Sequence, residues 1–163
     1  MTPFLSSEID KRGIAIKGLY RVSGVKSKVE KLCQAFENGA ELVDLSDVHP
    51  NVIANVVKLY MRQLPEPLCT FRLYPDFMRV AGACPALESG QPRPVDWDLQ
   101  EKEASEALRR LCLQLPHYHL KTLGFLCHHL NRISLQSELN NMPASNLAIG
   151  KHLKRVKGTS VSI

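Results

Sequence analysis

The sequence predicts an all-α fold in a single domain, and three observations support this. Apolar residues recur at helical spacing, i, i+3, i+4 and i+7, through most of the 163 residues. No stretch shows the alternation of apolar and polar residues that is typical of a strand, and no internal repeat stands out. Hydrophobic residues make up 44% of the chain and charged residues 23%, which is the composition of an ordinary globular domain.

Two amphipathic helices are expected in the first half of the chain. Apolar residues at 29, 32, 33 and 36 predict the first, and Gly39 suits its end because glycine takes a left-handed cap without strain. Pro50 suits the first turn of the second helix, where a missing N–H costs nothing. The Leu-Pro-Glu-Pro-Leu segment at 64–68 ends that helix, since an interior proline costs about 3 kcal/mol.

The helix that begins at Pro50 has two opposite faces. The apolar stripe consists of Ile53, Val57, Tyr60 and Leu64. The polar stripe, on the opposite side, consists of Asn55, Lys58 and Arg62. The apolar stripe is therefore predicted to face the core.

The second half of the chain has the same helical character. A short helix is expected around 71–80, and the prolines and Gly90 within 84–96 predict a surface loop. One apolar stripe predicts a helix that ends at Pro116, and a second stripe predicts the helix that follows it. The first stripe consists of Leu99, Leu108, Leu111, Cys112 and Leu115. The second consists of Leu120, Leu123, Leu126, Cys127, Leu130 and Ile133. Pro143 opens a further helix that carries Asn146 and Leu147.

The net charge of +5 is concentrated at the end of the chain. Residues 151–163 hold four basic residues and no acidic one, which leaves 17 basic against 16 acidic residues in the rest. A nearly neutral body argues against nucleic-acid binding. We expect a helical domain at 3–150 and a basic, disordered tail at 151–163, which is either simply solvated or in weak contact with an anionic membrane.

The cysteines indicate a reducing compartment. Their number, five, is odd, their spacing is irregular, and no C-x-x-C occurs, which argues against a disulfide framework and a structural zinc site. Three of them, Cys33, Cys112 and Cys127, fall in apolar helical patterns, where a thiol behaves as a small hydrophobe. No signal peptide and no membrane-spanning run is visible. We expect a cytoplasmic protein that can be recruited to membranes.

Several enzyme signatures are absent from the sequence. It contains no phosphate-binding loop, no dinucleotide fingerprint and no G-x-S-x-G elbow. Four histidines, at 117, 119, 128 and 129, lack the spacing of metal ligands and are predicted to lie on helix surfaces. The carboxylates suggest no acid–base pair. We therefore expect no metal site.

One loop places an arginine between two glycines just ahead of a helix. Residues 18–24 read Gly-Leu-Tyr-Arg-Val-Ser-Gly, a turn that can hold the guanidinium of Arg21 at a surface. On residue types alone, a structural arginine is the more common outcome. Lys58 and Arg62 are, on the same basis, a solvated helix face.

Three motifs occur in the order found in a known family. The loop at 18–24 resembles the arginine-finger loop of Rho GTPase-activating (RhoGAP) domains. Residues 58–68 resemble the family's second block, K-x-[YF]-x-R-x-L-P-x-P-L, and residues 140–148 resemble its third, N-x-M-x-x-x-N-L-A. The resemblance covers about residues 3–149 and implies a RhoGAP-like helical bundle. The stretch 29–39 is most similar to the branch whose members also carry an F-BAR and a C1 domain.

The resemblance implies a function and a role for four residues. It implies a GTPase activator that regulates a Rho-, Rac- or Cdc42-type small GTPase in its GTP-bound state. Arg21 would be the catalytic arginine finger, and Lys58 would support the finger loop and contact the GTPase. Arg62 would be an orienting or interface residue, and Asn146 would hydrogen-bond the GTPase near its first switch. The protein itself would perform no reaction on a substrate of its own and would need no cofactor, since GTP and Mg²⁺ would belong to the partner.

The chain departs from the family pattern at both ends. After Ala148 the family reads V-V-F-G-P-x-L and continues through further helices, whereas this chain becomes basic at residue 150. The first helix looks shortened. We therefore expect a domain that lacks its C-terminal helices, and the alternatives to an activator are a GTPase-binding adaptor without activity and an unstable fragment. The preferred GTPase, the oligomeric state and any neighbouring domains are left open.

Overall fold

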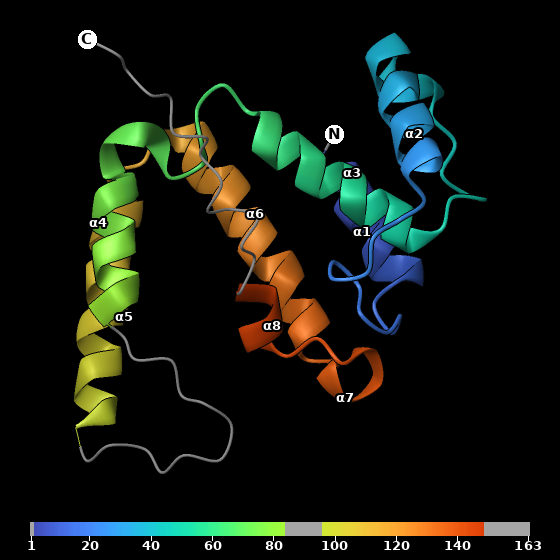
Figure 1. Ribbon diagram of the computed structural model, residues 1–163. Helices are drawn as coiled ribbons and strands as arrows, with labels where there is room; N and C mark the ends of the chain where they lie inside the picture. The colour runs from blue at the N-terminus through green and yellow to red at the C-terminus, as the bar shows by residue number, and fades with distance from the viewer. Residues whose placement is uncertain (1, 84–95, 149–163) are drawn as a thin grey trace, which may run out of the picture. The chain divides into compact units, whose positions relative to one another are not determined.

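The computed structural model describes residues 2–83 and 96–148, which form helices joined by short connections (Figure 1). No strand occurs within these two ranges, so the all-α prediction is confirmed. None of the described helices is long and apolar enough to cross a membrane. The predicted loop at 84–96, apart from Asp96, and the predicted tail at 151–163 lie outside the described residues.

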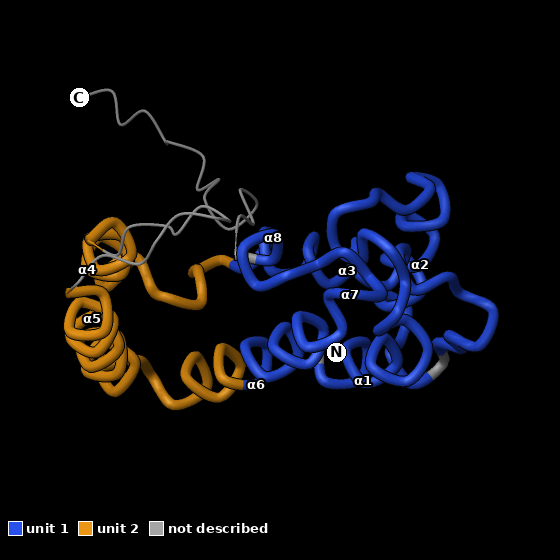
Figure 2. Tube along the Cα trace, turned by 90° about the horizontal axis from the view of Figure 1, so that it is seen from below, with its two compact units in different colours: residues 1–64, 125–163 blue, residues 65–124 orange. Residues whose placement is uncertain are grey.

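The chain divides into two compact units, which Figure 2 shows in different colours. Unit 1 consists of residues 1–64 and 125–163, and unit 2 consists of residues 65–124. Helix α6 (His117–Ser134) contributes its first turns to unit 2 and the rest to unit 1. The four residues for which the sequence implies a role all lie in unit 1: Arg21, Lys58, Arg62 and Asn146.

Unit 1 is built around helix α3. Its elements, besides the end of α6, are α1 (Thr2–Arg12), α2 (Lys26–Asn38), the 3-10 helix η1 (Ala40–Leu42), α3 (Pro50–Gln63), α7 (Ser137–Asn140) and α8 (Ala144–Ala148). Both α1 and α2 pack against α3. The buried apolar core of this unit includes Leu5, Ile9, Leu19, Leu32, Ile53, Val56, Val57, Ile133 and Met142.

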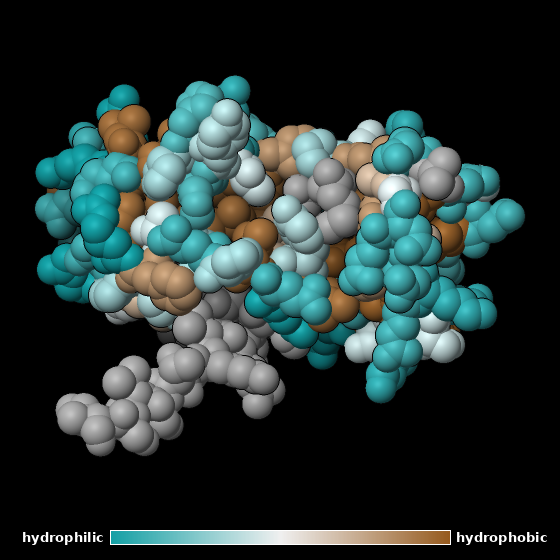
Figure 3. Space-filling model, turned by 90° about the horizontal axis from the view of Figure 1, so that it is seen from above, coloured by the Kyte–Doolittle hydropathy of each residue, from teal (hydrophilic) through white to brown (hydrophobic). Residues whose placement is uncertain are grey.

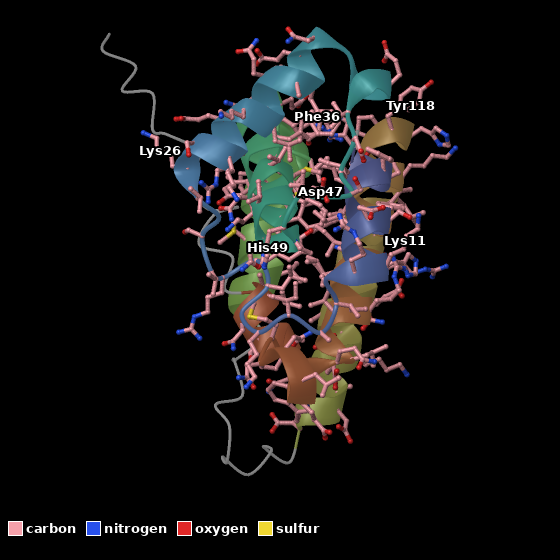
Figure 4. The ribbon with its side chains drawn as sticks, turned by 90° about the vertical axis from the view of Figure 1, so that its right-hand side faces the viewer. Lys11, Lys26, Phe36, Asp47, His49 and Tyr118 are labelled. Carbon is pink, nitrogen blue, oxygen red and sulfur yellow. The ribbon has the colours of Figure 1, made fainter. Side chains whose placement is uncertain are left out.

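Helix α3 begins where the sequence predicts. Pro50 is its first residue, and the Nδ1 atom of His49 accepts a hydrogen bond from the backbone N–H of Asn51 at 3.2 Å. A side-chain acceptor at this position satisfies one of the N–H groups that a helix leaves open at its start. Figure 4 labels His49 at this end of α3 and Lys26 at the start of α2.

The predicted apolar stripe of α3 is only half correct. Ile53 and Val57 are buried, but Tyr60 is 37% exposed and Leu64 follows the last helical residue. All the fully buried residues of α3 lie between Pro50 and Val57, whereas Leu64 is half-buried.

Helix α2 ends at Asn38, and Gly39 follows it as predicted. Gly39 has a φ of 149°, which is positive but is not the left-handed cap conformation that the sequence suggested. Glycine is still the residue that takes such a φ readily. The predicted stripe is confirmed, because Leu32 is buried and Val29, Cys33 and Phe36 pack against the core.

Unit 2 contains α4 (Thr70–Ala83) and α5 (Trp97–Cys112), which pack against each other. Helix α4 is longer than the predicted 71–80 and continues through Pro75. Of the predicted stripe, Leu99, Leu108, Leu111 and Cys112 lie on α5, but the helix ends at Cys112 rather than at Pro116, so Leu115 follows it. Leu115 is buried, whereas no residue of α5 itself is fully buried and Leu99 remains 60% exposed. Hydrophobic patches are visible between hydrophilic side chains on the face of the protein in Figure 3.

Candidate functional site

The loop at 18–24 is a tight turn with two residues in the left-handed region. Gly18 has a φ of 70° and Tyr20 a φ of 68°. The carbonyl oxygen of Gly18 accepts hydrogen bonds from the N–H groups of Arg21 (2.8 Å) and Val22 (2.7 Å). A non-glycine residue at such a φ is uncommon and is held there by its surroundings. The backbone on both sides of Arg21 is therefore fixed.

Both glycines of the loop are needed for close packing. A Cβ atom at Gly18 would lie 2.7 Å from the Cγ2 atom of Val22, at a φ that side chains rarely adopt. A Cβ atom at Gly24 would lie 2.9 Å from the Cα atom of Val52 in α3. The backbone of the loop at Gly24 therefore lies close to the backbone of α3 at Val52.

The side chain of Arg21 is exposed. Across residues 2–83 and 96–148, its guanidinium has no hydrogen-bond or ion-pair partner, although its own backbone N–H is bonded in the turn. The structure thus combines a fixed backbone with a free, charged head group, an arrangement that suits contact with an external anion.

The structure brings Lys58 to this loop. Its Nζ atom donates to the carbonyl oxygen of Tyr20 at 2.9 Å, although the two residues are 38 positions apart. Burial lowers the pKa of Lys58 from its ordinary value, and the charge of Arg62 lowers it further. One turn back along α3, Asn55 donates to the carbonyl oxygens of Asn51 (2.7 Å) and Val22 (3.4 Å). Helix α3 therefore holds the loop on both sides of Arg21.

Arg62 and Asn146 stand apart from these hydrogen bonds. Arg62 is exposed on the last turn of α3, and the described residues offer it no side-chain partner. Asn146 lies on α8, partly exposed, and donates to the carbonyl oxygen of Asn141 at 3.2 Å. Neither residue hydrogen-bonds to Arg21 or Lys58 within the described part of the chain.

The third motif reaches the loop through Asn140 instead. The backbone oxygen of Asn140 accepts from the N–H of Gly18 at 2.7 Å. Its buried side chain donates to the carbonyl oxygens of Ile14 and Ile133, both at 2.8 Å, and accepts from the N–H of Met142 at 2.7 Å. Sequence reasoning assigned no role to Asn140, because all of these partners are backbone groups that no motif reveals.

The prediction that all four histidines lie on helix surfaces is wrong for His129. Its ring is completely buried between Asp10 of α1 and Tyr20 of the loop. The ring nitrogens provide the reason, because both have polar partners and the usual cost of burying imidazole is offset. The prediction for Cys127 is also wrong in part, since its side chain is exposed.

Among the residues that the structure describes, no group of three or more histidine, cysteine, aspartate or glutamate side chains could hold a metal ion.

Comparison with known proteins gives consistent results. Residues 5–150 match the RhoGAP domain. Rho GTPase-activating protein 29 from Danio rerio is 49% identical over 157 residues, which cover 88% of this chain and 11% of that protein. Rho GTPase-activating protein 45 is 44% identical in Xenopus laevis and 43% identical in Homo sapiens, over 96% of this chain. The chain spans only 15% and 14% of these two proteins.

Solved structures resemble the chain in the same way. The BH domain of the GTPase regulator associated with focal adhesion kinase superposes with a TM-score of 0.74 at 26% identity. That match covers 91% of this chain and 74% of the solved chain. Human Rho GTPase activating protein 15 gives a TM-score of 0.73 at 25% identity, over 90% of this chain and 64% of that one.

Proposed function

The chain belongs to the RhoGAP domain family, and from this we propose that it activates GTP hydrolysis by a Rho-family small GTPase, with Arg21 as the arginine finger. It acts on the GTP-bound partner and performs no reaction on a substrate of its own. GTP and Mg²⁺ belong to the partner.

The observation that carries this proposal is the state of Arg21. Its backbone is fixed by the turn at Gly18 and by Lys58, whereas its head group is exposed and has no partner in the described part of the chain. Hydrolysis develops negative charge on the transferred phosphoryl group and the leaving oxygen. An arginine held in place before the reaction stabilises that charge without paying for reorganisation, and a finger supplied in trans is worth about 10³–10⁵ in rate.

The other motif residues surround this finger in distinct ways. Lys58 fixes the finger loop through the carbonyl of Tyr20, and its lowered pKa reflects the desolvation that this contact requires. Arg62, exposed one turn further along α3, contributes charge to the surface that meets the GTPase. Asn146, the middle residue of α8, presents its amide for a hydrogen bond to the partner.

Two further parts of this proposal rest on the sequence. The basic residues within 151–163 favour weak contact with an anionic membrane, and the thiol composition favours a cytoplasmic location. Membership of the F-BAR and C1 branch stays a prediction.

A single-turnover assay tests the function. Rho-, Rac- and Cdc42-type GTPases loaded with GTP are mixed with the wild-type chain, with Arg21→Ala, and with Arg72→Ala as a matched control for loss of an exposed arginine. We expect stimulation of at least one GTPase by the wild type and by Arg72→Ala, and a loss of about 10³-fold or more in Arg21→Ala.

Binding of each variant to the GTP-loaded GTPase is measured in parallel. Arg21→Ala is expected to bind nearly as well as the wild type, because the finger acts mainly on the transition state. If Arg21→Ala keeps more than about a tenth of the stimulation, the finger assignment fails. If the wild type binds but never stimulates, the chain is an adaptor.

A further inference from the structure

A chain of hydrogen bonds that passes through the buried His129 ring runs from helix α1 and helix α6 to the finger loop. The Nδ1 atom of His129 lies 2.7 Å from Oδ1 of Asp10, and its Nε2 atom lies 2.8 Å from the hydroxyl oxygen of Tyr20. The other carboxylate oxygen of Asp10 accepts two hydrogen bonds from Arg132, at 2.5 and 3.0 Å. These four residues all belong to unit 1.

When the His129 ring is neutral, the donors and acceptors of this chain fit a single arrangement. The Asp10 carboxylate can only accept, so the Nδ1 atom of His129 carries the proton and donates to it. The Nε2 atom of the neutral ring then accepts from the Tyr20 hydroxyl. Burial lowers the pKa of His129 against the opposing charge of Asp10, and burial raises the pKa of the Tyr20 phenol well above its ordinary value. Both shifts favour the neutral ring and the protonated phenol.

Tyr20 is therefore fixed at both ends. Its hydroxyl is bonded to His129, and its carbonyl oxygen accepts from Lys58 at 2.9 Å. Between these two points its backbone holds a φ of 68°, which costs free energy for a residue with a Cβ atom. Arg21 is the next residue. The direction in which Arg21 leaves the loop consequently depends on how firmly Tyr20 is held.

We propose that His129 and Tyr20 are positioning residues for the arginine finger: the hydrogen bond between them holds Tyr20 in its left-handed conformation and so aims Arg21. This inference rests on the proposed function. The opposite possibility is that the same hydrogen bonds only stabilise the core of unit 1. A positioning role affects the transition state selectively, whereas a stability role affects every complex equally.

The test variant is Tyr20→Phe, which removes one hydroxyl and keeps the ring. Tyr118→Phe is its matched control, because Tyr118 is 81% exposed. Affinity is measured for the responsive GTPase loaded with a non-hydrolysable GTP analogue and, separately, with GDP and aluminium fluoride, which mimics the transferring phosphoryl group. The single-turnover rate at saturating variant is measured as well.

A positioning role has a distinct signature in these measurements. We expect Tyr20→Phe to lower the affinity for the GDP–aluminium fluoride complex, and the saturated rate, by about tenfold, as for the loss of one hydrogen bond. The affinity for the GTP-analogue complex should stay within about twofold of the wild type. In an Arg21→Ala background, Tyr20→Phe should have no further effect, because it acts through Arg21.

A second pair of variants tests His129 directly. His129→Gln keeps a donor for Asp10 and an acceptor for Tyr20, whereas His129→Leu keeps neither. We expect the glutamine variant to retain more transition-state affinity than the leucine variant when both have the same affinity for the GTP-analogue complex.

Two results would overturn this inference while leaving the proposed function intact. Tyr20→Phe could lower both affinities equally, which would indicate a purely structural role, or it could leave both unchanged. Failure of the proposed function looks different: Arg21→Ala itself would then bind the GDP–aluminium fluoride complex as well as the wild type.

Discussion

Lys58 holds the finger loop from helix α3, and we propose that it also contacts the partner GTPase. Its ammonium group is partly buried and bonded to the carbonyl oxygen of Tyr20, yet it lies on the same helix as the exposed Arg62. Removing the ammonium group of Lys58 leaves the carbonyl oxygen of Tyr20, the residue before Arg21, without this hydrogen-bond donor. The residue is therefore expected to affect both GTPase affinity and the rate of hydrolysis.

We predict that Lys58→Met and Asn146→Ala each weaken GTPase engagement by roughly 1–3 kcal/mol, the cost of losing a polar partner in an interface. Lys58→Met should also lower the saturated rate, because it loosens the loop, whereas Asn146→Ala should not. Titration of the GTP-loaded partner and single-turnover kinetics measure the two effects. Lys28→Met, an exposed lysine of α2, is the control. Unchanged affinity and rate in both variants would make the two positions an ordinary solvated face.

Asn140 is expected to matter for stability rather than for catalysis. We predict that Asn140→Ala lowers the free energy of unfolding by about 2 kcal/mol or more. The substitution leaves the Ile14 carbonyl and the Met142 N–H without partners, and the Ile133 carbonyl keeps only its bond from the N–H of Gln136. Urea unfolding measures this, with the exposed Asn131→Ala as control. A loss below about 1 kcal/mol would show that these groups find other partners.

The burial of His129 could not be predicted from the residues next to it in the sequence. His128 and His129 are neighbours on one helix, and only the second faces the core. The polar partners that make burial possible are 109 and 119 residues away. Local patterns carry no information on such distant partners, so these hydrogen bonds could not be predicted from the sequence. The motif at 18–24, by contrast, was enough to propose Arg21 as the finger.

The helices themselves were largely predictable from periodicity. The expected helices at α2, α3, α5, α6 and α8 all occur, because each repeats its apolar pattern over several turns or begins at, or directly after, a proline. Burial was harder to predict, as the exposed Tyr60 and Leu99 show. A stripe indicates which face of a helix is apolar, but whether another element covers that face depends on the fold.

The contact between the finger loop and α3 depends on Gly24. We predict that Gly24→Ala lowers the free energy of unfolding by about 1–3 kcal/mol, because its Cβ would meet the backbone of Val52, which cannot give way as a side chain can. Gly124→Ala is the matched control. It lies inside α6 with nothing within 4 Å of its Cβ position, and it should stabilise the protein by about 0.5–1 kcal/mol through helix propensity.

The urea midpoints of Gly24→Ala and Gly124→Ala measure these two changes in stability. A Gly24→Ala variant as stable as Gly124→Ala would mean that the loop can move away from α3 without cost. Because the loop carries Arg21, we also expect Gly24→Ala to lower the stimulated rate, and Gly124→Ala to leave it unchanged.

The stability of the folded chain should depend on pH through His129. The charged and titratable groups around its ring are Asp10 from α1, Tyr20 from the loop and Arg132 from its own helix. Burial lowers the pKa of this histidine in the folded state, with Asp10 opposing and Arg132 assisting the shift. As the pH falls through about 6.5, the unfolded chain binds a proton on His129 that the folded chain does not. The free energy of unfolding must therefore decrease.

We predict that this group alone removes at most about 1.4 kcal/mol between pH values of about 7.5 and 5.5. Other histidines titrate in the same range, so the comparison is between the wild type and His129→Gln, which keeps the hydrogen-bonding groups but cannot take up the proton. Urea midpoints at the two pH values should decrease more in the wild type than in the variant. Equal decreases would mean that His129 is protonated in the folded state as readily as in the unfolded chain, and the neutral ring that links Asp10 to Tyr20 would not be the state that holds the finger loop.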